Sequence, residues 1–311
     1  MAKILIIGGG AAGMAAAAFL GEHGHQVHVF EKNEKLGKKL FITGKGRCNL
    51  TNSCDEETFF QSVVSNEKFL YSAFHGFSNE DAIAYFEQLG LPLKEERGGR
   101  IFPKSDHSSD VIKALEQRMK ELDVKIHLNS LVKEILLQET DEGQKKVTGV
   151  LLENGQEIVG DKVIVATGGM SYQATGSTGD GYEFAKQAGH KVTTLRSALV
   201  PMETKEEYIP RMQGLSLKNV RFTVKDGKKV LYQDFGELLF THFGMSGPLV
   251  LTASSYLGKK LEKKELQGTI DLKAALTEEQ LDARLLREFE AGKNKQFKNV
   301  CLLYTSPSPR D

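Results

Sequence analysis

The most regular pattern in the chain is an apolar run near its start that ends abruptly in glycines. Residues 3–7 read KILII, and such an unbroken apolar run is typical of a parallel strand buried on both faces. A glycine-rich turn follows at 8–13, and the alanine-rich residues 15–20 then favour a helix. A second apolar run, 26–30, ends in Glu31. The pattern predicts a strand–turn–helix–strand unit of an α/β fold with a Rossmann-type parallel sheet.

Apolar periodicity predicts further elements after this unit. Residues 58–90 are predicted to be helical, with one helix over 79–89, and residues 108–122 carry an amphipathic helical pattern. Strands are predicted at 124–128, 131–138, 146–153 and 156–159, and in a run from 162 that ends in glycines. Short turns at 141–143 and 154–155 join the strands between 131 and 159, which predicts an antiparallel meander beside the parallel sheet.

The pattern changes near residue 196, where we expect a domain boundary. Short strands are predicted beyond it, and they indicate a second, β-rich domain over 196–300. The predicted strands are 220–225, 229–233 and 237–241. Pro248 suits the first position of a helix, and 277–289 repeats apolar residues at helical spacing.

Composition narrows the class of protein. The chain has 311 residues, enough for about two domains, and 40% hydrophobic with 26% charged residues is typical of a globular protein. Its 41 basic and 41 acidic residues cancel, which argues against tight non-specific binding of nucleic acid but leaves room for a local basic surface. No run is long enough to span a membrane, and no metal site is predicted. Three cysteines without a CxxC motif or an export signal predict a cytoplasmic protein.

The first glycine-rich turn has the spacing G-x-G-x-x-G. Gly8 allows the tight turn, Gly10 lets a pyrophosphate approach the backbone, and Gly13 lets helix and strand pack closely. Ala11 and Ala12 open the helix, whose free N–H groups favour phosphates. A purely structural glycine turn is the alternative. The order of strand, glycines, helix and strand favours dinucleotide binding.

Glu31 stands at the end of the second predicted strand, about 20 residues after the last glycine of the turn. Its carboxylate can accept both hydroxyls of an adenosine ribose. It would repel a 2′-phosphate, so NADP is disfavoured at this position. The glycine pattern and this acid do not by themselves distinguish FAD from NAD.

A second glycine-rich stretch, KLGKKLFITGKGRCNLTN, covers 35–52. Gly44 and Gly46 let the backbone approach a ligand, and cations such as Arg47 suit a diphosphate; a solvated basic loop is the alternative. Cys48 is a candidate redox thiol whose pKa Arg47 could lower. A small side chain packed near the cofactor is the favoured interpretation, because no partner cysteine stands at redox-motif spacing.

The first turn followed by GKKLFITGKGRCNLTN resembles the BaiN-type NAD(P)/FAD-dependent oxidoreductases. This family also includes aminoacetone oxidases and ribosomal RNA dihydrouridine synthases. SYQATGSTGDG at 171–181 and GELLFTHFGMSGP at 236–248 match the family closely, although Gln173 replaces an expected proline and should leave its loop less rigid. The resemblance covers 1–300.

The resemblance implies non-covalent FAD in a domain formed by 1–195, with 196–300 as the substrate domain and the start of a helical insertion. The adenosine would lie on Glu31, the flavin near 44–49, and the adenine against the backbone of Val132. Asp180 either caps a helix or approaches the cofactor. The implied cofactor-binding residues are Gly8, Gly10, Ala11, Ala12, Gly13, Glu31, Lys32, Lys39, Gly44, Gly46, Arg47, Cys48, Asn49, Val132, Ala166, Thr167, Gly168 and Asp180.

The expected activity is that of an FAD-dependent oxidoreductase using NAD(P)H. Reduction of a carbon–carbon double bond is favoured, such as uridine to dihydrouridine in rRNA. Oxidation of a small amine and a non-catalytic flavin-binding protein are the alternatives. His242 is a candidate proton donor, although a lone histidine is more often structural. The lysines at 259–264 form either a solvated helix face or, with an RNA substrate, phosphate contacts.

The last eleven residues, CLLYTSPSPRD at 301–311, do not continue the pattern. They resemble the translation of a sequencing adapter, and the match to the family ends at Val300. We therefore expect an artefactual tail, and a natural chain that continues to a last FAD-binding segment.

Overall fold

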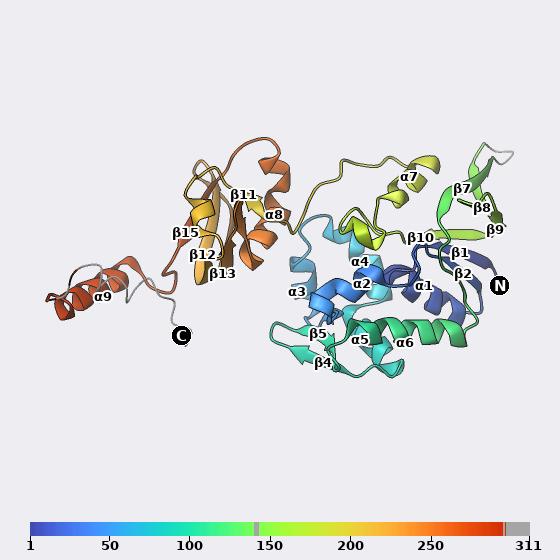
Figure 1. The fold of residues 1–311 in the computed structure, drawn as a ribbon, viewed down its shortest axis with the longest axis horizontal. Coiled ribbons are helices and arrows are strands. Elements are labelled where there is room, and N and C mark those ends of the chain that lie inside the picture. The colour runs from blue at the N-terminus through green and yellow to red at the C-terminus, as the bar shows by residue number, and fades with distance from the viewer. Residues whose placement is uncertain (140–142, 295, 297–311) are drawn as a thin grey trace. The chain divides into compact units, whose positions relative to one another are not determined.

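The computed structural model describes residues 1–139, 143–294 and 296 (Figure 1). The tail at 301–311 and the first two residues of the turn predicted at 141–143 lie outside the described residues. The chain divides into two compact units, one of residues 1–193 and one that begins at Thr194. Each is described by itself below.

The first unit contains a four-stranded parallel sheet, whose strands β10, β1 and β2 are labelled in Figure 1. Its order is β10-β1-β2-β6, and every neighbouring pair is parallel. Helix α1 (Ala11–Glu22) connects β1 to β2, as parallel strands require a crossover. The strands are β1 (Lys3–Ile7), β2 (Gln26–Phe30), β6 (Lys125–His127) and β10 (Lys162–Val165).

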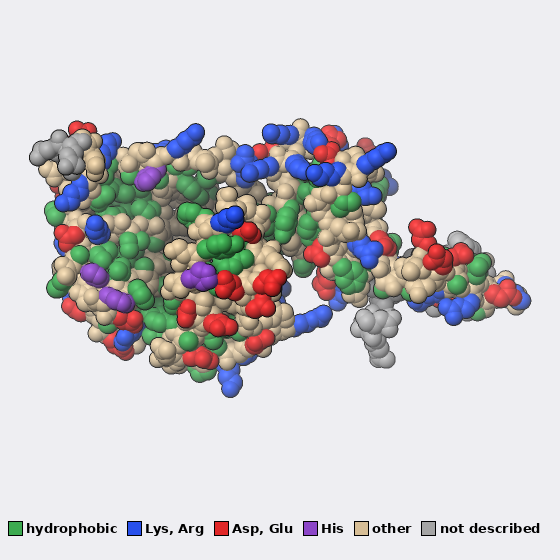
Figure 2. All heavy atoms as spheres, turned by 180° about the vertical axis from the view of Figure 1, so that it is seen from behind, with side chains coloured by type: hydrophobic (Ala, Val, Ile, Leu, Met, Phe, Trp, Pro, Cys, Tyr) green, Lys and Arg blue, Asp and Glu red, His purple; other side chains and the backbone are tan. Residues whose placement is uncertain are grey.

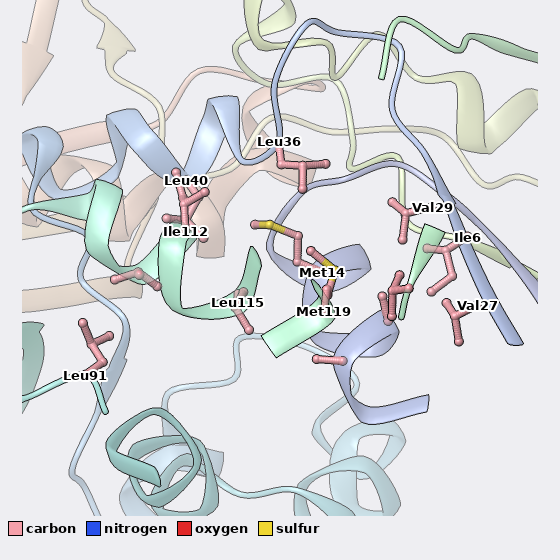
Figure 3. Packing of buried hydrophobic residues seen from close by; sticks show 14 of the residues in the cluster. Ile6, Met14, Val27, Val29, Leu36, Leu40, Leu91, Ile112, Leu115 and Met119 are labelled. Atoms are coloured by element: carbon pink, nitrogen blue, oxygen red, sulfur yellow. The ribbon is translucent and has the colours of Figure 1, made fainter. Parts of the chain in front are cut away.

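The apolar run of β1 is buried on both faces of the sheet, as predicted. Ile4 and Ile6 pack with Met14 of α1 and Met119 of α6 (Ser108–Glu121) on one face (Figure 3). Leu5 and its neighbours pack on the other face against the predicted meander. The meander is an antiparallel sheet of β7 (Val132–Glu139), β8 (Lys145–Leu152) and β9 (Glu157–Val159).

A smaller subdomain of helices and a hairpin completes the first unit. The helix predicted from residue 79 is confirmed as α5 (Asn79–Gln88), and Ser78 and Asp81 form a capping box at its start. The glycines at 98 and 99 turn β4 into β5, which pairs with β3. The remaining elements of the first unit as a whole are α2 (Lys38–Ile42), β3 (Thr51–Asn52), α3 (Glu56–Gln61), α4 (Glu67–Gly76), β4 (Leu93–Glu96), β5 (Arg100–Pro103) and α7 (Asp180–Gln187), with short 3-10 turns at Thr43–Gly46 and Gln173–Thr175.

The second unit is a five-stranded antiparallel sheet in the order β11-β14-β13-β12-β15, with α8 (Pro248–Leu261) packed against it. The two strands predicted at 229–233 and 237–241 are one strand, β13, so that prediction was wrong. Gly236 does not end the strand; it lies against Leu249 of α8 and lets the helix approach. The strands are β11 (Met202–Glu203), β12 (Ser216–Asp226), β13 (Lys229–Phe240), β14 (Gly244–Ser246) and β15 (Gln267–Asp271).

Two further helices belong to this unit. A 3-10 helix covers Ile209–Met212. The helix predicted at 277–289 is confirmed as α9 (Glu278–Ala291), which begins after a capping box of Thr277 and Gln280. Within the described part of the chain, no helix is both long and apolar enough to cross a membrane.

Candidate functional site

A cavity of about 830 Å³ opens at the carboxyl ends of β1, β2 and β10. Ile7, Phe30 and Val165, the last residues of these strands, contribute to its lining. Ligands of open parallel sheets bind at this edge, and the volume lies in the usual range for cofactor sites. The topology therefore brings most of the predicted dinucleotide residues to one cavity, but Gly13, Gly44, Gly46 and Arg47 are not part of its lining.

The first glycine turn forms one wall of the cavity, and each glycine is needed for a different reason. Gly8 has a φ of +106°, and a Cβ there would lie 2.5 Å from the carbonyl oxygen of Ala166. A Cβ on Gly13 would lie 1.9 Å from the carbonyl oxygen of Gly8. A Cβ on Gly10 would meet no atom within 4 Å. Gly8 and Gly13 thus permit close packing, whereas Gly10 leaves space for a ligand.

The N-terminus of α1 points a set of backbone donors at this space. Gly10 is the N-cap residue and provides no side-chain hydrogen bond to the first turn. Ala11 and Ala12 line the cavity. The first N–H groups of a helix have no intrahelical acceptors, and they carry partial positive charge. This end of the cavity is therefore suited to a phosphate.

Glu31 lies at the end of β2 with only 7% of its surface exposed, and it lines the cavity. One carboxylate oxygen accepts a hydrogen bond from the N–H of Gly9 at 2.8 Å. The other accepts from the backbone and side-chain nitrogens of Asn33 at 2.9 and 2.6 Å. A carboxylate has about four acceptor positions, so Glu31 can hold the glycine turn and still accept a ribose hydroxyl.

Two lysines at the cavity have different partners. The Nζ of Lys32 donates to Asp180 and to Thr178, at 2.7 Å each, and so joins the end of β2 to the start of α7. Burial opposes ionisation of Asp180, but hydrogen bonds from Lys32 and Thr178 outweigh it and lower the pKa of the carboxyl. The Nζ of Lys39 lies 3.2 Å from the hydroxyl of Ser171. No carboxylate among the described residues lies within 4.0 Å of it, and burial lowers its pKa. Lys39 is thus available to an anion.

The second glycine stretch contributes only part of its residues to the cavity. Cys48 and Asn49 line it, whereas Gly44, Gly46 and Arg47 do not. The guanidinium of Arg47 pairs with Glu96 and, at 2.7 Å, with Asp106. The Cζ atom of this guanidinium lies 4.2 Å from the centre of the Phe102 ring.

The expectation that Arg47 lowers the pKa of the Cys48 thiol was wrong. Cys48 is buried, and burial raises the pKa of its thiol, although a hydrogen bond with Thr43 acts in the opposite direction. The positive charge of Arg47 is balanced by its two carboxylate partners. A protonated, buried thiol is a small packing group at neutral pH.

The chain segment that returns to the parallel sheet lines the cavity beside the first glycine turn. Ala166, Thr167 and Gly168 line the cavity directly after β10, and Val132 lines it at the start of β7. Gly168 has a φ of +72°. Sequence reasoning missed several lining residues, and the glycines at 176 and 181 marked only the segment 175–182. The missed residues include Gly9, Asn33, Gly37, Thr43, Ser130, Leu131, Thr175, Gly176, Ser177, Gly181 and Tyr182.

His242 belongs to the second unit, where it lies between β13 and β14 and is exposed. Its ring centre is 4.9 Å from that of Phe243. It is not part of the lining of the described cavity, and its role as a proton donor stays a prediction. Within the described ranges, no group of three or more His, Cys, Asp or Glu side chains could hold a metal ion.

Residues 2–288 match the family model described as the HI0933-like protein Rossmann domain. The chain is 33% identical to the 3-dehydro-bile acid delta(4,6)-reductase of Clostridium scindens, covering 87% of this chain and 64% of that protein. It is 35% identical to the ribosomal RNA dihydrouridine synthase of Haemophilus influenzae, covering 81% and 61%. The corresponding Escherichia coli enzyme is 33% identical, covering 81% and 60%. The match therefore spans less than two thirds of the length of these relatives.

Proposed function

The chain belongs to the HI0933-like Rossmann family, and we propose that it is an FAD-dependent oxidoreductase. The observation that carries the proposal is the cavity itself. Three groups surround one site at the carboxyl ends of the parallel strands. They are Gly10, beside which the space is open, the N-terminus of α1 and the buried carboxylate of Glu31. These are the groups that a dinucleotide requires.

The lining residues of this cavity suggest a place for several parts of FAD. Glu31 would accept the adenosine ribose, and the backbone at Val132 would contact the adenine. The first turn of α1 and the ammonium of Lys39 would hold the diphosphate. The flavin half would then extend toward Cys48 and Asn49. When bound, the flavin supplies the hydride chemistry, and the protein supplies position and electrostatics.

For the reaction, we favour reduction of a carbon–carbon double bond with NAD(P)H as the reductant. Two kinds of relative support this choice: one is named as a delta(4,6)-reductase and two as dihydrouridine synthases. Dihydrouridine differs from uridine by two hydrogens across a ring double bond, so both names describe the same type of reduction. Residues 196–300 would provide the substrate domain, with His242 as a candidate proton donor.

An RNA substrate would use the lysines of the second unit. Lys259 and Lys260 lie in the last turn of α8 and Lys263 lies just after it, and no carboxylate of the described chain pairs with them within 4.0 Å. Lys228 and Lys229 are exposed at the turn between β12 and β13. Lys264, three residues after the end of α8, pairs with Asp226 at the end of β12 at 2.5 Å, so the end of the helix lies near this turn. Lys and Arg side chains gather along the upper edge of this unit in Figure 2.

The direct test is anaerobic mixing of the FAD-loaded protein with NADH or NADPH, followed through the visible flavin absorbance. Bleaching by either nucleotide, and recovery on addition of a uridine-containing RNA or an enone, would support the proposed reductase. Bleaching by a small primary amine instead would favour amine oxidation. A flavin that none of these compounds reduces would support the non-catalytic alternative.

Salt dependence distinguishes RNA from a small substrate. RNA affinity should fall with salt, by about 0.7–0.9 in the log–log slope for each phosphate contact. Replacing Lys259, Lys260 and Lys263 together by alanine should reduce this slope, whereas Lys113→Ala on α6, an exposed lysine of the first unit, should not. RNA binding that is absent or independent of salt would favour a small substrate.

A further inference from the structure

The backbone of residues 44–48 has an unusual conformation beside the cavity. Gly44, Lys45 and Gly46 have φ values of +56°, +60° and +86°, and Cys48 has +58°. Lysine and cysteine carry a Cβ, which disfavours the left-handed region. Such a turn persists only when surrounding contacts determine it, and these turns concentrate at functional sites.

The side chain of Arg47 connects this turn to a neighbouring hairpin. It pairs with Glu96 at the end of β4 and with Asp106 just after β5. Lys94 joins the same carboxylates, at 2.5 Å from Asp106 and 3.6 Å from Glu96. The guanidinium also lies over the buried ring of Phe102. The turn is thereby fastened to a hairpin that lies about fifty residues away in the sequence.

The next two residues of the chain face the cavity. Cys48 is 5% exposed, and its N–H donates to the carbonyl of Thr43 at 3.0 Å. Asn49 follows it in the cavity lining, and the N–H of Leu50 donates to the carbonyl of Ile101 in β5 at 2.8 Å. The wall is therefore fixed on both sides, by Arg47 before it and by the strand pairing of β3 after it.

We propose that Arg47 is a positioning residue: its contacts with Glu96, Asp106 and Phe102 hold the left-handed turn, and the turn places Cys48 and Asn49 against the flavin half of the cofactor. The assignment of the wall to the flavin rests on the function proposed above. A direct role of Arg47 on a diphosphate is disfavoured, because its guanidinium is already satisfied by two carboxylates outside the cavity lining.

Alkylation of Cys48 in the protein without cofactor tests the positioning contact. Iodoacetamide labelling resolved by peptide mass spectrometry measures how often the buried thiol becomes exposed. Arg47→Ala should speed labelling of Cys48 about tenfold, because charge-assisted hydrogen bonds are lost. The partly exposed Cys54 is the internal reference, since unfolding of the whole unit would accelerate both thiols.

Arg100→Ala is the matched control. The guanidinium of Arg100 also lies near the Phe102 ring, at 5.8 Å, but its Nε donates to the carbonyl of Arg97 rather than to the two acids. This variant should leave the labelling rate of Cys48 unchanged. An unchanged rate in Arg47→Ala would overturn the proposal. If Arg47→Ala accelerates both thiols, Asp106→Asn decides, and the absence of a selective effect on Cys48 would then overturn it.

Addition of FAD tests the second half of the proposal. In the wild-type protein, FAD should slow the labelling of Cys48 but not that of Cys54. In Arg47→Ala this protection should be several-fold weaker. Bound FAD that leaves the Cys48 rate unchanged would overturn the placement of this wall. Failure of the wild-type protein to bind FAD would count against the proposed function alone, because the labelling without cofactor reports the positioning contact independently.

Discussion

Two glycine-rich turns border the same cavity, and they are held in place by different forces. The turn at 8–13 is enclosed by backbone atoms: added Cβ atoms on Gly8 and Gly13 would strike carbonyl oxygens. The turn at 44–48 is held by the charges and the ring that surround Arg47. A Cβ added to Gly44 would lie 2.9 Å from the backbone nitrogen of Asn49, and a Cβ added to Gly46 would meet no atom within 4 Å.

The difference shows that glycine and cation content does not by itself identify a phosphate loop. In the first turn, glycines serve packing and ligand approach. In the second turn, glycines serve the left-handed backbone, and Arg47 faces a hairpin rather than the cavity. The available cation, Lys39, comes from α2, before the second turn.

The largest effect is expected for Gly8→Ala. The backbone at this position has a positive φ, and an added Cβ would lie 2.5 Å from the carbonyl oxygen of Ala166. We therefore expect the free energy of unfolding to fall by at least about 3 kcal/mol. Denaturant unfolding measures it. Gly10→Ala is the matched variant, because φ is −80° and the space is open.

Gly10→Ala should leave stability within about 0.5 kcal/mol of the wild type while weakening FAD about tenfold or more, since its Cβ occupies the path of the diphosphate. If Gly10→Ala destabilised the fold as much as Gly8→Ala, the distinction between packing and ligand glycines would be incorrect.

Glu31→Ala should have the next largest effect. The carboxylate holds Gly9 and Asn33 and is proposed to accept the ribose, so FAD binding should weaken by about 1–3 kcal/mol. Isothermal titration with FAD measures the change. Glu31→Gln, which keeps one carbonyl acceptor, should lose less affinity. An unchanged FAD dissociation constant in Glu31→Ala would contradict the assignment.

The parallel sheet and the first turn could be predicted because local signals agree there. The KILII run, the glycine spacing and Glu31 all specify one β-α-β unit, and the structure places Gly8, Gly10 and Glu31 on the cavity. The partners of Arg47 could not be predicted, because Glu96 and Asp106 are distant in sequence and carry no motif. The same limit applied to β13, which was predicted as two strands, because the contact of Gly236 with Leu249 of α8 is distant in sequence.

Gly46→Ala should have a smaller effect of a different kind. The φ of +86° disfavours alanine, but no neighbouring atom obstructs its Cβ. We expect destabilisation of about 1–2 kcal/mol, and FAD affinity changed less than in Gly10→Ala. Gly10→Ala is expected to lose FAD affinity with little loss of stability, whereas Gly46→Ala is expected to lose stability with little loss of FAD affinity. The pair therefore distinguishes a glycine required by the backbone conformation from a glycine required by the ligand. A large loss of FAD affinity without loss of stability would instead indicate that Gly46 approaches the cofactor.

The smallest expected effect is a selective response of the second turn to acid. A hydrogen bond from Arg47 lowers the pKa of Glu96 below its ordinary 4.5, and hydrogen bonds from Lys94 and Arg47 lower that of Asp106 below 3.8. A carboxyl with a lowered folded pKa stabilises the fold above its ordinary value, and this stabilisation is lost as the pH falls through the lowered value. Both partners are exposed enough that salt should also weaken the effect.

Hydrogen exchange of single amides measures this response. The protection factor of the Cys48 amide, which donates to Thr43, should stay constant between about pH 7 and 5 and fall as the pH drops below the ordinary pKa values of the two acids. The amides of Gly8 and Met14 donate to backbone carbonyls of Phe30 and Gly10, so their protection should change less. Asp106→Asn should show a weaker acid response at Cys48, because one titrating partner is gone. Equal losses at both turns would mean that acid unfolds the whole unit, and that the second turn is not held separately by its charges.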